Sequence, residues 1–150
     1  MAGTYRPRGD VFGHEEHTAD VWLVSEGCSG EEVLSNMLEG LYGTMGREYT
    51  LEGSEEEFGM DISGGSLENL MIDLLTEALF LFEVGPRLIV DPSIHLWKEG
   101  KKDRLEVSGR SVVFSIPEGQ GGMEVKAITY HGASFIEERG SFRARVLLDI

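Results

Sequence analysis

The sequence predicts an α+β domain in which two helices pack on a mixed or antiparallel β-sheet, with elements in the order β-α-β-α-β-β-β-β. Two stretches, 29–46 and 66–85, carry apolar residues at helical spacing behind a serine. Stretches before and between them alternate apolar and polar residues, which is the period of a strand. After residue 86 the chain shows four further strand-like stretches, so we expect the helices to be followed by an antiparallel run.

The first strand is expected from His17 to Val24, because apolar residues at 19, 21 and 23 alternate with Asp20 and Trp22. Residues 1–13 hold three glycines, one proline and little apolar pattern. We therefore predict a flexible segment over residues 1–13 and a single domain over residues 14–150.

Both helices have clear start and stop signals. Ser29 and Glu32 form a capping box, and Gly46 is expected to end the first helix. Its apolar stripe consists of Val33, Leu34, Met37, Leu38, Leu41, Tyr42 and Met45. Ser66 can cap the second helix, which Gly85-Pro86 should end. Polar residues fill only a narrow strip of the second helix, so it should be buried on more than one side.

The remaining strands follow from alternation. Phe58, Met60 and Ile62 indicate a short strand between the helices, and the run Glu55–Glu57 before it is expected to be a solvated loop. A bend is expected at Asp91-Pro92, since proline cannot donate to a strand ladder. The four late strands are predicted at Leu88–Trp97, Leu105–Ile116, Met123–Ile136 and Phe142–Asp149.

Composition narrows the function classes. Thirteen Lys and Arg stand against 27 Asp and Glu, a net charge of −14, so general binding to nucleic acid is not expected. A basic protein partner or a metal ion suits this charge, although it also serves solubility. One cysteine excludes an internal disulfide and a zinc site of several thiolates. With neither an apolar leader nor a membrane-spanning run, we expect a cytoplasmic protein without a membrane partner.

Three groups near the two chain ends are candidate metal ligands. If the first and last strands are neighbours, Asp20 and Asp149 converge at their ends, beside the α-carboxylate of Ile150. Two carboxylates about 4 Å apart repel by roughly 4 kcal/mol at an effective dielectric constant of 20. A shared proton or a bound cation would relieve this, and oxygen ligands favour calcium, magnesium or manganese over zinc. Alternatively, Asp20 caps a turn and Asp149 is solvated at a frayed terminus.

Other ionisable residues leave alternatives open. His14, His17 and Asp20 would share a face and could bind zinc on a helix, but not on the expected strand. His17 is instead predicted to be a hydrogen-bonded orienting residue near Asp20. Lys126 lies in a strand-like stretch and could pair with Glu124, with the acidic end, or with a partner's acid or phosphate, or be solvated. A competing reading is a metal-dependent hydrolase with Asp20 and Asp149 as ligands and His17 as base.

From about residue 14 to residue 150 the chain resembles the archease family. The resemblance rests on His17-Thr18-Ala19-Asp20, the acidic amphipathic first helix, the long apolar second helix, the stretch Val125–His131 and the terminal Asp149-Ile150.

The resemblance implies a small acidic protein that assists RtcB-type RNA ligases in tRNA splicing and RNA repair, and that is not itself an enzyme. Such a protein would promote guanylylation and repeated turnover of the ligase. The resemblance also implies a divalent ion, calcium first and magnesium or manganese as alternatives, held by Asp20, Asp149 and Ile150. It assigns partner activation to Lys126 and Asp20. Chaperoning of a tRNA methyltransferase is the alternative that the family suggests.

Overall fold

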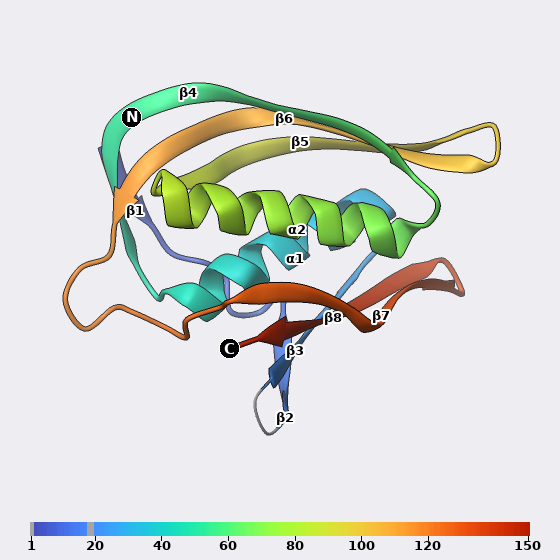
Figure 1. Ribbon diagram of the computed structural model, residues 1–150, viewed down its shortest axis with the longest axis horizontal. Coiled ribbons are helices and arrows are strands. Elements are labelled where there is room, and N and C mark those ends of the chain that lie inside the picture. The colour runs from blue at the N-terminus through green and yellow to red at the C-terminus, as the bar shows by residue number, and fades with distance from the viewer. Residues whose placement is uncertain (1, 18–19) are drawn as a thin grey trace.

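The computed structural model describes residues 2–17 and 20–150, with only the backbone at residues 2 and 15–17. Two helices, α1 (Gly30–Met45) and α2 (Leu67–Val84), form a layer between two antiparallel four-stranded sheets (Figure 1). The β4 sheet has the order β1-β4-β6-β5, and the β3 sheet has the order β2-β3-β8-β7. The strands are β1 (Ala2–Tyr5), β2 (Gly13–His17), β3 (Asp20–Gly27), β4 (Tyr49–Gly64), β5 (Arg87–Glu99), β6 (Lys102–Ser115), β7 (Ala127–Glu138) and β8 (Ser141–Asp149). The predicted α+β class is confirmed.

Both helices begin where their caps predict. The Ser29 hydroxyl accepts a hydrogen bond from the Glu32 N–H at 3.1 Å, and the Ser66 hydroxyl accepts one from the Asn69 N–H at 3.2 Å. α2 is buried on more than one side, as expected, and each helix contacts strands of both sheets. Neither described helix has the length and apolar content needed to span a bilayer.

The N-terminal segment differs from its prediction. β1 pairs with the start of β4, and the Tyr5 ring packs 6.0 Å from Tyr42 and 5.7 Å from Tyr49 between ring centroids. The Tyr5 hydroxyl also donates to Glu39 of α1 at 2.6 Å. Residues 2–5 therefore form an edge strand, held by the ladder with β4 and by the contacts of Tyr5.

The predicted first strand is a hairpin in the structure. β2 ends at His17 and β3 begins at Asp20, and the two strands pair antiparallel in register. The single strand predicted from His17 to Val24 was therefore wrong in its start, and Thr18 and Ala19 lie outside the described residues.

β4 is much longer than predicted and includes the glutamate run. Arg87 of β5 reaches Glu56 at 3.1 Å and Arg110 of the neighbouring β6 reaches Glu55 at 3.2 Å, so cations of two other strands balance these acids. The prediction of a solvated loop over Glu55–Glu57 was wrong, although these side chains are exposed.

β7 begins at Ala127 rather than at Met123. The preceding residues are bonded to the end of α1 instead: the Gly122 N–H donates to the Met45 carbonyl at 3.0 Å and the Met123 N–H to the Thr44 carbonyl at 2.8 Å. The bend predicted at Asp91-Pro92 is confirmed by a register shift between Val90 and Ser93.

The close contact of Gly122 with α1 leads to a stability prediction. A Cβ at Gly122 would overlap the Thr44 carbonyl oxygen and lie 2.8 Å from the Met45 carbonyl carbon, both of which are backbone atoms. Gly122→Ala should therefore lower the free energy of unfolding by about 1–3 kcal/mol, measured by urea denaturation. Gly121→Ala is the matched control, since its Cβ meets nothing within 4 Å. Equal stability of the two variants would contradict this account of the α1 contact.

Candidate functional site

The first and last strands of the predicted domain lie side by side in the β3 sheet. The register of β3 and β8 places Asp20 directly opposite Asp149 and Trp22 opposite Leu147. Directly opposed residues of an antiparallel pair project from the same face, with Cβ atoms about 4.5–5.5 Å apart. The structure thus confirms the expectation that these two strands are neighbours and that the two aspartates converge.

Burial of the intervening residues decides which face carries the aspartates. Val21 and Leu148, the residues that alternate with the two aspartates, are buried on the helix side of the sheet, at 4% and 0% exposed. Asp20 and Asp149 therefore project from the opposite face, where both are half-buried.

Two further predicted residues lie at the same end of β8. The Lys126 N–H donates to the Asp149 carbonyl at 2.7 Å, which attaches the segment before β7 to the end of the last strand. Ile150 follows directly, with its side chain half-buried against the core. We call Asp20, Lys126, Asp149 and Ile150 the acidic tip. The Lys126 side chain is exposed and makes no ion pair with another described residue, so the pairing with Glu124 is not formed.

His14 does not belong to the acidic tip. It pairs with Leu23 in the ladder, so it faces α1, and its Nε2 lies 2.8 Å from the Thr44 hydroxyl. Partial burial lowers the pKa of His14. The structure therefore does not bring together the histidine–aspartate zinc site that a helix would have formed. The His17 backbone pairs with Asp20, but its side chain lies outside the described residues and its orienting role stays a prediction.

Sequence reasoning missed the structure that lies on this face beside the tip. The Arg145 guanidinium stacks 4.2 Å from the centroid of the Trp22 ring, and its Nε donates to the Gly132 carbonyl at 3.3 Å. Gly132 has φ 68°, and a Cβ there would lie 2.7 Å from the ring. The irregular stretch of β7 between Thr129 and Ser134 therefore packs over Trp22. A glycine inside a strand-like pattern was the available signal.

A buried hydroxyl also faces the tip. Thr129 lies opposite Leu147, on the same face as the Ala127–Asp149 pair next to it. Its Oγ1 is buried without a hydrogen-bond partner among the described residues. A buried hydroxyl without a partner costs about 1–3 kcal/mol, so this position suits a ligand or a ligand-bound water.

The donor set of the tip fits a hard cation. The carboxylates of Asp20 and Asp149 and the nearby Thr129 hydroxyl are oxygen donors of the kind that calcium, magnesium and manganese prefer. Among the side chains that the structure describes, which leave out those of residues 15–17, no three from His, Cys, Asp or Glu come together to hold a metal. A site at the tip would therefore need the terminal carboxylate, main-chain oxygens or water beside its two aspartates.

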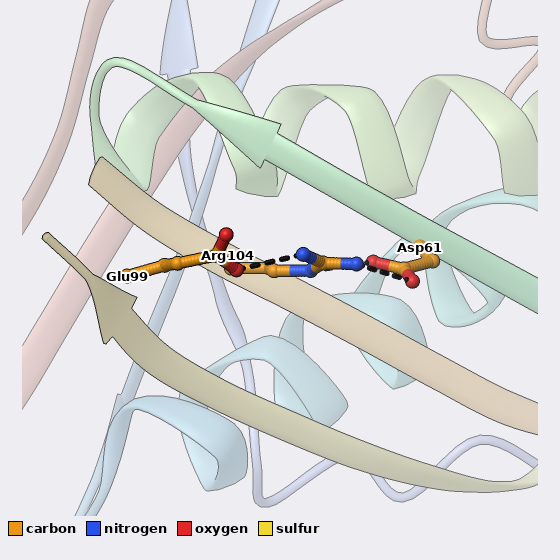
Figure 2. A network of polar contacts seen from close by, with 3 residues as sticks. All are labelled: Asp61, Glu99 and Arg104. Atoms are coloured by element: carbon orange, nitrogen blue, oxygen red, sulfur yellow. Dashed lines mark hydrogen bonds and ion pairs between the residues drawn. The ribbon is translucent and has the colours of Figure 1, made fainter.

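The β4 sheet contains another pair of directly opposed acids, one of which binds an arginine. Asp61 lies opposite Glu106, and Arg104 binds Asp61 through Nε at 2.9 Å and Nη2 at 2.8 Å and Glu99 through Nη1 at 2.7 Å (Figure 2). The hydrogen bonds from Arg104 lower the pKa of Asp61. This sheet balances its acids with a cation of its own, which makes Glu106 a useful control.

Comparisons with known proteins define the class of the chain. The sequence model of the Archease protein family matches residues 12–150, and the chain belongs to this family. The protein archease of Methanosarcina mazei is 26% identical over 151 residues, which cover 95% of this chain and 98% of that protein. The protein archease of Danio rerio is 30% identical over 150 residues, which cover 100% and 91%.

Solved structures agree. The solution structure of protein 1598 from Methanobacterium thermoautotrophicum matches with a TM-score of 0.66 and 29% identity, over 93% of this chain and 98% of that chain. A crystal structure of an archease from Thermotoga maritima, described as a possible chaperone, matches with a TM-score of 0.59 over 91% and 94% of the two chains. At 22% identity the second likeness concerns the fold alone.

The opposed aspartates lead to a prediction for metal-dependent stability. Asp149→Asn should raise the free energy of unfolding in EDTA by about 0.2–1 kcal/mol, because like charges directly opposite in a sheet are destabilising. The same variant should lose the rise in melting temperature that millimolar calcium gives the unaltered protein. Both quantities follow from thermal unfolding with EDTA or calcium.

Glu106→Gln is the matched control, since it removes one negative charge from the opposed pair Asp61 and Glu106 in the β4 sheet. Its response to calcium should equal that of the unaltered protein. A calcium-dependent rise that persists in Asp149→Asn would contradict a metal site at the tip.

Proposed function

We propose that this protein is an accessory protein that activates an RtcB-type RNA ligase in the cytoplasm, promoting guanylylation and repeated turnover of the ligase without catalysing ligation. The observation that carries the proposal is the pairing of Asp20 with Asp149 at one end of the β3 sheet in a member of the archease family. The pairing concentrates negative charge at one exposed end of a chain whose net charge is −14.

The acidic tip supports this role by its charge. An acidic projection is attracted by the basic cleft of an enzyme that handles nucleotides and RNA, and the attraction raises the rate of association. A divalent ion, calcium first and magnesium or manganese as alternatives, would be held by Asp20, Asp149 and Ile150 and would neutralise their repulsion. The ladder between β3 and β8 fixes both strands, so the carboxylates of Asp20 and Asp149 are held on the same face of the sheet.

Lys126 gives the tip one positive group. Its backbone is fixed by the hydrogen bond to Asp149, while its exposed side chain remains available to a partner. An ammonium group in this place suits a phosphate or a carboxylate in the ligase active site. We therefore assign partner activation to Lys126 together with Asp20.

A chaperone role has one supporting observation, the description of the Thermotoga maritima relative as a possible chaperone. In this alternative, the protein would act as the chaperone of a tRNA-modifying methyltransferase. A metal-dependent hydrolase with Asp20 and Asp149 as ligands and His17 as base is the other alternative; the two aspartates are paired, and the His17 side chain lies outside the described residues. Incubating the pure protein with RNA and phosphoesters, with and without ligase, separates these cases: turnover by the protein alone would contradict the accessory role.

The proposal predicts the effect of removing one carboxylate. Asp20→Ala or Asp149→Ala should abolish stimulation of an RtcB-type ligase, measured as guanylylated ligase and as product per ligase, with the melting temperature nearly unchanged. Glu57→Ala is the matched control, because it removes one exposed acid from a strand of the other sheet and should stimulate normally. Stimulation retained by both aspartate variants would contradict the role of the tip.

The terminal carboxylate is tested by extending the chain. Two glycines added after Ile150 move the α-carboxylate away from Asp149 and should weaken calcium binding measured by isothermal titration calorimetry. Two glycines added before Met1 serve as the control. An unchanged dissociation constant in the C-terminal extension would remove Ile150 from the ligand set.

A further inference from the structure

The end of α2 carries an apolar surface that no described element covers. Phe80 is 54% exposed and Val84 is 66% exposed, and at spacing i, i+4 they are neighbours on the helix surface. α2 lies at the front of Figure 1, with its outer face toward the viewer and no other element in front of it. Because the rest of α2 is well buried, two such exposed side chains in its last turns stand out against an otherwise polar outer strip.

A groove lies beside the same turns of α2, lined there by Leu79, Phe82 and Glu83, which are sequence neighbours of Phe80 and Val84. It has a volume of about 290 Å³ and lies between the C-terminal turns of α2 and the segment 121–125. Apolar groups form most of its wall: Met45, Leu79, Phe82, Met123 and Val125. Met123, at 38% exposed, also reaches the surface. We call the groove together with Phe80, Val84 and Met123 the α2 patch.

The charges at the α2 patch are all of one sign. Glu83 and Glu124 line the groove and are exposed, and among the described residues no lysine or arginine lines it. Glu83 also lies in the last turn of α2, which holds no basic residue. The C-terminal end of a helix has a partial negative charge, so an acid there is unfavourable by about 0.3–1 kcal/mol and a cation is favoured. The patch is therefore complementary to a lysine or arginine of a partner.

The α2 patch is continuous with the acidic tip. Val125 lines the groove, and the next residue, Lys126, is bonded to Asp149. Three residues from Met123 to Lys126 span at most about 10 Å. A protein that receives the tip is thus placed to cover the patch as well.

We propose that the α2 patch is a second docking surface for the same protein partner, an RNA ligase whose surface presents an apolar side chain beside a lysine or arginine. This inference rests on the proposed function. The apolar side chain enters the groove against Met123 and Val125, and the cation lies between Glu83 and Glu124. The patch supplies affinity, whereas the tip supplies activation.

The division of roles gives a direct test. Stimulation of an RtcB-type ligase is measured against the concentration of the protein, which yields a half-maximal concentration and a maximal stimulation. Phe80→Ser and Val84→Ser should raise the half-maximal concentration about five- to thirtyfold, the range for interface anchors, and leave maximal stimulation unchanged. Glu83→Gln should raise it less and should weaken its dependence on salt.

Ile136→Ser is the matched control, because Ile136 is 47% exposed in β7, in the part that pairs with the start of β8, while Asp149 lies at the end of β8. Its half-maximal concentration should equal that of the unaltered protein. Melting temperatures of all variants exclude unfolding as the cause, and the exposure of Phe80 and Val84 makes both substitutions tolerable.

Each other outcome overturns the inference. An unchanged half-maximal concentration in both serine variants, or a reduced maximum with an unchanged half-maximal concentration, would show that the patch does not dock the ligase. Self-association of the unaltered protein that Phe80→Ser abolishes would assign the patch to a second copy. No stimulation by the unaltered protein would remove the proposed function itself, a result distinguishable because it appears before any substitution is made.

Discussion

The antiparallel pairing of β3 with β8 is the constraint on which the rest of this structure depends. Val21, Leu23, Val146 and Leu148 must face the helices, and burying four such side chains stabilises the fold by a gross 6–12 kcal/mol or so. A slip of one residue would expose all of a strand's buried set, so the register is fixed. That register forces Asp20 opposite Asp149, where two charges about 4 Å apart would repel by roughly 4 kcal/mol at an effective dielectric constant of 20. Burial therefore outweighs repulsion, and the fold itself places two carboxylates together.

The position of this pair is what supports the proposed cation site, since the described side chains contain no three-residue metal cluster. The ladder supplies two side-chain carboxylates, Ile150 is proposed to supply a third, and a backbone hydrogen bond holds Lys126 next to Asp149. The helix layer adds a separate surface at the end of α2. In the proposed complex, the α2 patch would therefore recognise the ligase and the acidic tip would activate it.

Local signals in the sequence predicted the helices and the strand alternation well. Ser29 and Ser66 mark helix starts because a cap depends only on residues three positions away. The juxtaposition of Asp20 and Asp149 was expected only on the condition that two distant strands pair. Contacts that depend on other elements were missed: β1 is fixed by Tyr5 on Tyr42, and the Glu55–Glu57 run joins β4 because arginines of other strands balance it.

The exposed end of α2 was missed for a related reason. Periodicity shows that α2 is broadly apolar but does not show that Phe80 and Val84 lack a covering element, because that depends on how the segment 121–125 returns to α1. The hydrogen bonds from Gly122 and Met123 to α1 keep this segment beside the groove. The packing of Gly122 against α1 thus determines which surface is left exposed at the end of α2.

The central claim is that one cation is shared by groups from both ends of the polypeptide. Titrating the ¹⁵N-labelled protein with Mn²⁺ and following amide signals tests it most directly, since the ion broadens only nearby resonances. The account predicts that the signals of Asp20, Lys126 and Asp149 broaden first and together, at Mn²⁺ levels well below the protein concentration. Broadening that begins at other acids, such as Glu55–Glu57, while these three signals stay sharp, would contradict it.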